Sequence, residues 1–383
     1  MNPWFEPLLL AISIITLSYV VLVMFMRNGW RRGKAAPHSD APPSTSISVV
    51  VPARNESKHL PELLQQLANQ QYPTTLLQLV LVDDASEDNT FALMEAFAAQ
   101  HPQLNIIPIH LEDDPDCAAP KKRALTAGIE QATGSLIVTT DADCYPGPEW
   151  LATLASTYEA SKAKMLCGPV GFHRDDTLFK KLQTLEFMSL IGSTAGTTNM
   201  GLPVMCNGAN LAFERSAFDA VNGYSGTDGL ASGDDVFLML KMKRKWHGSV
   251  HFVQDKRAIV YTEAQESVGA FFQQRKRWAS KSRAYRDVGV ILVATIVLVM
   301  NLSILTALIT SVFAPSLLSF AIALIVFKSV VDFFFLHLVA SFFGRKSLLL
   351  LLLPEQVLYI FYVGIFGIVG WLGGYRWKGR TRT

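Results

Sequence analysis

Pairs of carboxylates are the residues in this 383-residue sequence that are best suited to chemistry. Asp141 and Asp143 follow the apolar run SLIVTT, and alternate side chains of an extended segment lie on one face. Two neighbouring carboxylates repel each other unless a cation lies between or beside them. Mg²⁺ and Mn²⁺ prefer such oxygen ligands and commonly share their ligand shell with substrate phosphates. Asp141-Ala142-Asp143 therefore indicates a metal and diphosphate site, and a solvated acidic turn is the alternative.

Two further aspartate pairs occupy positions where a carboxylate could either bind or act on a substrate or cap a helix. Asp83 and Asp84 end the run LVLVDD, where an acidic residue can accept a hydrogen bond from a nucleotide base or a ribose hydroxyl. The alternative is capping of the next helix. Asp234 and Asp235 follow Gly233 and precede VFLMLKMKRK. Acidic residues are favourable at a helix N-terminus, so capping competes with the role of a catalytic base on a well-fixed backbone.

Cations cluster at two places in the sequence. Lys121–Arg123 open a predicted helix, where positive charge opposes the helix dipole and so indicates an anionic ligand such as a pyrophosphate. In QRKRW, Arg277 can bridge phosphate oxygens and Trp278 can offer a face on which a sugar ring stacks. A solvated basic face is the alternative for the first cluster. A juxtamembrane basic cluster with an interfacial tryptophan is the alternative for the second.

The elements that position these residues alternate between strand and helix. Short β-branched or apolar runs predict strands, and helical apolar spacing predicts helices between them. Such alternation indicates a doubly wound α/β sheet in which the carboxyl ends of the strands meet at one edge. The loop Pro52–Glu56, the Asp83 pair and the Asp141 pair then converge at this edge. The predicted strands are 47–51, 77–82, 105–110 and 135–140, and the predicted helices are 60–71, 90–99 and 121–132.

Long apolar runs flank this domain. Residues 8–26 are uncharged, are long enough to cross a bilayer and precede Arg27, Arg31 and Arg32, so we expect an anchor (1–34) with the following residues in the cytoplasm. A cleavable signal peptide is the alternative. Residues 35–46 are rich in Pro, Ser and Ala and read as a linker. The expected soluble domain covers 47–287, and a membrane region follows at 288–383 with spans near 288–314, 317–343 and 348–372.

The fourth apolar run leaves the topology open. Four complete spans would place the C-terminal tail outside, yet the tail carries Arg376, Lys378, Arg380 and Arg382, which favour the cytoplasm. Either the tail breaks this rule, or the segment around Pro354-Glu355 is re-entrant or interfacial; three C-terminal spans are slightly preferred. Within the third run, Lys328 and Asp332 are four residues apart and can pair on one helix face or contact a substrate.

Composition excludes several classes of protein. The formal net charge is only +2, so a nucleic-acid partner is not expected. Half of the residues are hydrophobic, which excludes a disordered chain. The four cysteines show no C-x-x-C spacing, and we interpret them as buried or free thiols in a reducing compartment.

Taken together, PARNE, VDDASEDNT, KKRAL, DAD, GDD and QRKRW occur in an order that resembles the membrane-bound family 2 glycosyltransferases of the GT-A fold. That group includes cellulose, hyaluronan and poly-N-acetylglucosamine synthases and ceramide glucosyltransferases. The resemblance covers about residues 47–278. Thr126, where the family usually has Asn, and Asp234, where Glu is commoner, are mild departures.

The resemblance implies a role for each motif. The catalytic pair would be Asp234 and Asp235, with Asp235 as the base, and the metal ligands would be Asp141 and Asp143. Cys206–Asn210 would lie near the acceptor. The implied substrate-binding residues are Pro52, Arg54, Asn55, Glu56, Asp83, Asp84, Lys121, Asp141, Gln274, Arg277 and Trp278.

We therefore expect an integral membrane protein, of a bacterial inner membrane, with a mixed-sheet GT-A domain in the cytoplasm. It would transfer a sugar with inversion from a nucleotide-sugar donor, implied to be a UDP-sugar, to a hydroxyl of a lipid-linked or glycan acceptor, with Mg²⁺ or Mn²⁺ as cofactor. A processive polysaccharide synthase is one alternative, although four apolar segments offer little wall for a polymer channel. A membrane-anchored nucleotidyltransferase and a non-catalytic transporter or scaffold are more distant alternatives.

Overall fold

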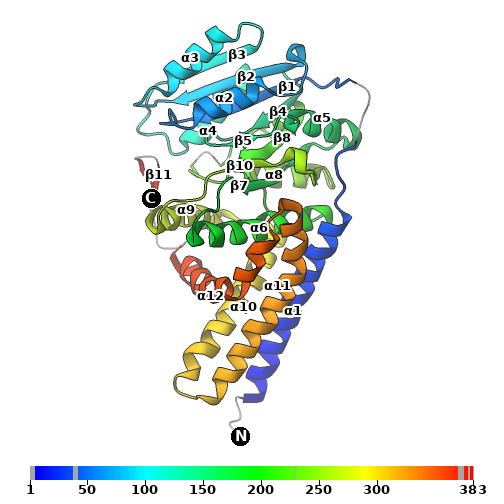
Figure 1. Ribbon diagram of the computed structural model, residues 1–383, viewed down its shortest axis with the longest axis vertical. Helices are drawn as coiled ribbons and strands as arrows, with labels where there is room; N and C mark the ends of the chain where they lie inside the picture. Colours follow the sequence, from blue (N-terminus) through cyan, green and yellow to red (C-terminus); the bar gives the residue numbers. More distant parts are fainter. Residues whose placement is uncertain (1–4, 38–41, 228, 370–374, 378–379, 383) are drawn as a thin grey trace.

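The computed structural model describes residues 5–37, 42–227, 229–369, 375–377 and 380–382. An α/β domain forms one end of an elongated molecule, and long apolar helices form the other (Figure 1). The predicted α/β class and mixed GT-A-like sheet are confirmed.

The main sheet has seven strands in the order β3-β2-β1-β4-β8-β6-β9. The neighbours β3, β2, β1 and β4 are parallel, whereas β8 runs antiparallel to both β4 and β6. Its central strands are buried because β-branched and leucine side chains pack against helices on both faces. The strands are β1 (Ile47–Ala53), β2 (Leu77–Asp84), β3 (Asn105–Leu111), β4 (Leu136–Thr139), β6 (Met165–Cys167), β8 (Leu211–Glu214) and β9 (Val250–Phe252).

A second sheet lies nearer the apolar helices, with strand order β5-β10-β7 (Tyr145–Pro146, Val260–Thr262 and Val170–Phe172). Helices pack against the sheets. The helices of the domain are α2 (Leu60–Ala68), α3 (Thr90–Gln100), α4 (Pro120–Gln131), α5 (Trp150–Ser161), α6 (Leu178–Asn199), α7 (Arg215–Ala220), α8 (Asp234–Lys245) and α9 (Val268–Ser280).

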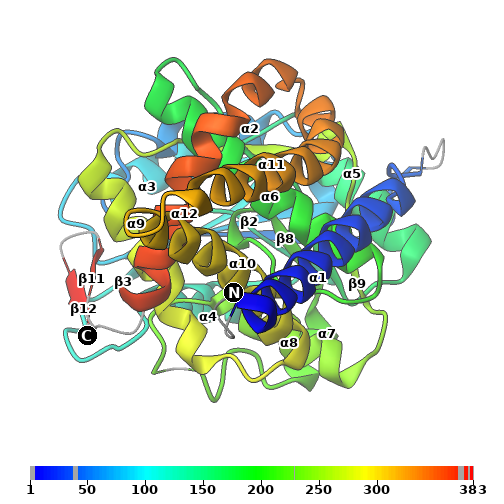
Figure 2. The ribbon, with the colours of Figure 1, turned by 90° about the horizontal axis from the view of Figure 1, so that it is seen from below.

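Four helices are long and apolar enough to cross a membrane, as the sequence predicts. They are α1 (Phe5–Arg32), α10 (Val288–Ser311), α11 (Ser316–Phe343) and, after a 3-10 segment at Lys346–Leu351, α12 (Leu352–Val369). Helices α1, α10 and α11 pack against one another in pairs and form a three-helix bundle that projects from the domain (Figures 1 and 2).

Glycines let the first of these helices lie directly on the domain. A Cβ atom built on Gly196 of α6 would lie 2.4 Å from the carbonyl oxygen of Met26. A Cβ atom on Gly29 would be closer still to the backbone of Gly196. Helices α1 and α6 therefore cross backbone to backbone, which fixes the anchor against the domain rather than leaving it on a loose linker.

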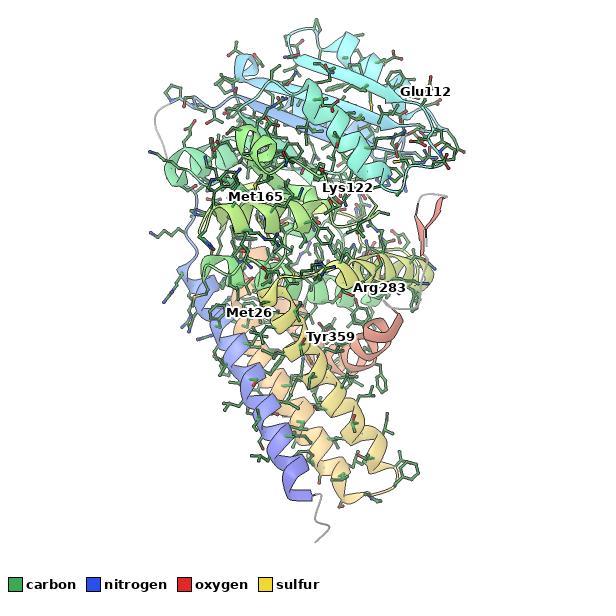
Figure 3. The ribbon with its side chains drawn as sticks, turned by 180° about the vertical axis from the view of Figure 1, so that it is seen from behind. Met26, Glu112, Lys122, Met165, Arg283 and Tyr359 are labelled. Atoms are coloured by element: carbon green, nitrogen blue, oxygen red, sulfur yellow. The ribbon has the colours of Figure 1, made fainter. Side chains whose placement is uncertain are left out.

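Helix α12 does not follow the length of the bundle. The 3-10 segment before it packs against α6, and Arg345 Nη1 donates to Asp175 Oδ1 of the domain at 3.0 Å. After α12, strand β11 (Tyr375–Trp377) pairs with β12 (Arg380–Arg382) and lies against α9. Both ends of α12 therefore lie on the domain side, and Figure 3 shows Tyr359 beside the domain-proximal part of the bundle.

Some predicted features fall outside the described residues: 38–41 of the linker, 370–372 of the last predicted span, and Lys378 of the tail. The predicted domain boundaries stay predictions. All four cysteines have no disulfide partner, and Cys144, Cys167 and Cys206 are buried.

Candidate active site

Two adjoining cavities open where β1, β2 and β4 end. Their volumes are about 90 and 130 Å³, and both are lined by Lys121, Asp141, Asp143 and Arg277. These shared residues make the two cavities one cleft. The parallel strands bring their carboxyl ends to this edge, as predicted, and α9 closes the cleft from the opposite side.

Besides the shared Lys121, Asp141 and Arg277, the first cavity holds four more of the predicted substrate-binding residues: Pro52, Arg54, Glu56 and Asp84. Arg54 is 7% exposed, and its Nη1 donates to the carbonyl oxygens of Asp84 (2.7 Å) and Ala85 (2.9 Å). The loop after β1 is thereby tied to the loop after β2. Asp84 also accepts a 2.9 Å hydrogen bond from Arg123, which fixes its carboxylate at the cavity wall.

Two predicted substrate-binding residues line neither cavity. Asp83 is fully buried, and its Oδ2 pairs with His110 Nδ1 at 2.8 Å and accepts from the Ser86 amide. Asn55 has a φ of 52° and accepts from the amide of Glu87, which holds the loop. The geometry assigns these two side chains to the support of the site, and Asp84 is the member of its pair that faces the cleft.

The three cations at the start of α4 bind different partners. Lys121 Nζ lies 2.6 Å from Asp141 Oδ1 and 3.9 Å from Asp234 Oδ2. Burial alone would lower the pKa of Lys121, but Asp141 and Asp234 outweigh it and raise that pKa above its usual value. Lys122 instead donates to the carbonyl oxygens of Thr227 and Leu230. Only Lys121 of the three lines the cleft, as a charged ammonium.

The second cavity contains the predicted catalytic pair at the N-terminus of α8. Asp235 Oδ2 accepts from the amide of Gly208 at 3.2 Å, and Asp235 Oδ1 lies 3.9 Å from Lys281 Nζ. A Cβ atom on Gly208 would lie 3.3 Å from Asp234 Oδ2, so glycine lets this backbone approach both carboxylates closely. Burial is the largest influence on Asp234 and raises its pKa.

Helix α9 presents Gln274, Arg277 and Trp278 to this cavity. Arg275, between them, is 2% exposed and forms an ion pair with Glu186 of α6. The Arg275 guanidinium lies 4.1 Å from the centre of the Trp278 ring. This cation–π contact and the ion pair hold the indole at the wall of the cavity.

Sequence reasoning missed Arg275 and Lys281. Lys281 lies four residues after Arg277, so helical spacing alone would have placed both on one face. Asp235 and Tyr285 outweigh the effect of burial and raise the pKa of Lys281. The cation therefore stays charged beside Asp235. Arg275 carried no signal in the sequence, because its partner is 89 residues away.

The carboxylates fit a divalent cation that is shared with a substrate. Within the described ranges, no group of three or more His, Cys, Asp or Glu side chains is arranged to hold a metal ion by itself. Asp141 and Asp143 nevertheless line the same cavity. Mg²⁺ sites commonly use one or two carboxylates and take their remaining ligands from phosphates and water.

Comparisons with known proteins give the same picture. Residues 42–281 match the family model described as "Glycosyltransferase like family 2". An undecaprenyl-phosphate 4-deoxy-4-formamido-L-arabinose transferase of Yersinia enterocolitica is 34% identical over 151 residues, which are 39% of this chain and 44% of that protein. Glycosyltransferase AglE of Haloferax volcanii is 29% identical over 126 residues, 33% of this chain and 40% of that protein. The chain thus spans less than half of the length of these curated relatives.

Among solved structures, a mannosyltransferase from Pyrobaculum calidifontis in complex with GDP-mannose and Mn²⁺ shares the fold. Its TM-score is 0.59 at 18% sequence identity, with coverage of 93% of this chain and 99% of that one. A special relation to the cellulose and hyaluronan synthases stays a prediction. The family model spans most of the chain and includes every residue of the cleft, so this chain belongs to the family 2 glycosyltransferases.

Proposed function

We propose that this glycosyltransferase transfers a sugar, with inversion, from a nucleoside-diphosphate donor to a hydroxyl group of an acceptor held at the membrane. One observation carries the proposal: Asp141, Asp143, Asp234 and Asp235 line one cleft together with Lys121 and Arg277. Such a cleft combines carboxylates for a base and a metal with cations for a leaving diphosphate.

The first cavity is proposed to take the nucleotide. Asp84 would accept a hydrogen bond from the base, as acidic residues at strand ends do in nucleotide-binding folds. Asp141 and Asp143 would hold Mg²⁺ or Mn²⁺. When bound, such an ion would offset the negative charge of the diphosphate. Lys121 and Arg277, which line both cavities, would stabilise the same charge as it develops on the leaving group.

Asp235 is proposed as the base. Its carboxylate would take the proton of the acceptor hydroxyl while that oxygen forms a bond to the anomeric carbon. The bond from the anomeric carbon to the phosphate oxygen breaks, and the nucleoside diphosphate leaves with the electron pair. The Gly208 amide and Lys281 hold the Asp235 side chain in place for this role.

The test is release of nucleoside diphosphate by the purified full chain with Mn²⁺, a panel of nucleotide sugars and membrane-lipid acceptors. Asp235→Asn should lower kcat by about 10²- to 10⁴-fold, because it removes general-base catalysis. Nucleotide affinity should stay within a few-fold of the wild type. Parallel loss of nucleotide binding in D235N would instead show a structural role. Asp143→Ala is the matched variant, and it should weaken metal-dependent nucleotide binding.

A lipid-phosphate acceptor is the second candidate, because the Yersinia relatives are named for transfer to undecaprenyl phosphate. An ionised phosphate oxygen needs no general base. D235N would then keep most of its kcat, so the same variant separates the two acceptor classes.

A further inference from the structure

A third and much larger cavity lies between the domain and the apolar helices. Its volume is about 550 Å³, which is within the range of roughly 300–1,000 Å³ that is usual for ligand pockets. Helices α1, α6, α10, α11 and α12 all contribute to its walls, and most of the lining side chains are apolar. They include Val23, Leu185, Leu190, Val293, Val297 and Phe335.

This apolar cavity adjoins the active site. Ala279 and Ser282 line the apolar cavity, whereas Trp278 and Lys281, from the same turn of chain, line the active-site cleft. The segment 204–208 is divided in the same way, with its first two residues in the apolar cavity and its last two in the cleft. A molecule with a polar end in the cleft therefore has an apolar space directly beside it.

The apolar cavity also opens toward the surface that a bilayer would cover. Ile291 of α10 lines the cavity and is 47% exposed, and Ala294 and Thr295 on the same helix are exposed as well. A hydrocarbon chain can therefore enter sideways from the bilayer without passing through water.

A polar cluster lies in the wall of this otherwise apolar space. Lys328 Nζ donates to Asp332 Oδ2 at 2.8 Å, and the Tyr19 hydroxyl donates to Asp332 Oδ1 at 2.7 Å. Glu355 is 7% exposed and lines the cavity, and its hydrogen bond with Gln356 is 3.5 Å long. Ionisable residues at membrane depth are costly and usually mark a functional site. The Lys328 ammonium already donates to Asp332 and to Gln356 Oε1, and Glu355 adds a second carboxyl group to the wall, so the cluster suits hydrogen-bond donors better than an added phosphate.

We propose that this cavity binds the hydrocarbon chain of the acceptor, and that the acceptor is a neutral lipid alcohol rather than a lipid phosphate. The inference rests on the proposed function, because it places the acceptor hydroxyl beside Asp235. Glu355 would accept a hydrogen bond from an O–H or N–H of the lipid. Burial of the chain in the cavity supplies binding free energy that the small polar cleft does not offer.

The test compares two substitutions at adjacent positions of α10. Val293 is 8% exposed and lines the cavity, whereas Leu292 is 54% exposed and does not. Val293→Phe should narrow the cavity and lower kcat/KM for a lipid alcohol at least tenfold. Leu292→Phe should match the wild type. The assay uses the full chain in nanodiscs with a panel of dioleoylglycerol, ceramide and undecaprenyl phosphate as acceptors.

Nucleotide binding and slow hydrolysis of the donor are the controls for folding, and both should be unchanged in V293F. If V293F misfolds, Ile291→Trp at the exposed mouth is the second variant and should show the same loss.

Equal transfer to lipid alcohols by the wild type and both cavity variants would overturn the proposal. Transfer to undecaprenyl phosphate alone, or hydrolysis without any lipid product, would also overturn it and leave the glycosyltransferase function standing. Failure to release nucleoside diphosphate from any donor would instead remove the proposed function itself.

Discussion

Asp234 and Asp235 are adjacent in the sequence, yet they have different neighbours. Asp234 lies 3.9 Å from Lys121, whereas Asp235 lies beside Lys281 and the Gly208 amide. Burial raises the pKa of Asp234, and the negative charges of Asp235 and Asp141 add to this effect, while Lys121 opposes it. As the pH falls, the carboxyl group of Asp234 therefore takes up a proton at a higher pH than an ordinary aspartate. Its neighbour Asp235 is the residue proposed to act as the base.

The raised pKa of Asp234 predicts the acid limb of the activity profile. If activity needs the charged form of Asp234, it should be lost on acidification at a higher pH than it would be with an aspartate of ordinary pKa. Asp234→Asn should remove this ionisation, so the acid limb of kcat/KM should move to lower pH while kcat at neutral pH also falls. A pH–rate profile of both proteins checks this, and an unchanged acid limb in D234N would contradict it.

The same shift predicts an effect on stability. A carboxyl group whose pKa is higher in the folded protein binds its proton more tightly there, so it stabilises the fold at low pH. That contribution is lost as pH rises through the raised pKa. At neutral pH the buried charge is a cost, and D234N should have a higher Tm than the wild type. The difference should shrink as the pH is lowered toward the ordinary aspartate range, and a thermal melt at each pH checks it.

At the scale of elements, α9 supplies the cleft with three side chains and is tied to α6 by a buried ion pair. The ion pair joins Arg275 to Glu186 and is covered by the rings of Trp278 and Phe271. These two rings also contact Phe187 and Phe179 of α6. Both ionic groups are more than nine-tenths buried. Removal of one partner therefore leaves an uncompensated charge in the interior.

Glu186→Gln should break this pair and destabilise the protein by about 3–5 kcal/mol, the usual cost of an unpaired buried charge. Trp278 loses its fixed position at the same time, so KM for the acceptor should rise more than KM for the donor. Glu266→Gln is the matched control, because Glu266 pairs with Lys180 of the same helix but is 79% exposed. E266Q should change neither stability nor KM appreciably. Denaturation and steady-state kinetics check both variants, and equal effects would argue against a positioning role.

At the scale of the whole molecule, the distribution of basic residues and the direction of α12 indicate the same membrane topology. Basic residues lie at the domain end of the bundle, in Arg27–Lys34 and Arg345-Lys346, whereas the turn at 312–315 carries no charge. By the rule that positive charge stays on the cytoplasmic side, we propose that the domain faces the cytoplasm. We propose three crossings, by α1, α10 and α11, with α12 beside the domain-proximal part of the bundle and the tail on the domain side.

Impermeant maleimide labelling of membrane vesicles in a Cys117→Ser background checks this topology. Single cysteines introduced by Ser347→Cys and Thr381→Cys should react from the side of the domain. One introduced by Phe313→Cys should react only from the opposite side. If the cysteine at position 381 reacts from the same side as the cysteine at position 313, α12 crosses the bilayer.

The sequence by itself determined which strand ends and helix starts carry the carboxylates and Lys121 of the cleft. The first strands and helices follow from long β-branched and apolar runs, and parallel strands necessarily bring Asp84, Asp141 and the loop after Ala53 to one edge. The four apolar helices follow from length and composition. The strands β6, β8 and β9 were not predicted, because three or four residues are too short to show a period.

Only the tertiary structure decided which of two residues adjacent in the sequence faces the cleft. Successive strand residues point to opposite faces, so Asp84 reaches the cleft and Asp83 does not. Successive helix residues are rotated by about 100°, so Lys121 reaches the cleft, whereas Lys122 binds the carbonyl oxygens of a distant loop. The composition of residues 352–369 shows that this helix is apolar, but it does not determine the direction in which the helix runs. That direction depends on long-range packing against α9, α10 and Lys328, which no local pattern encodes.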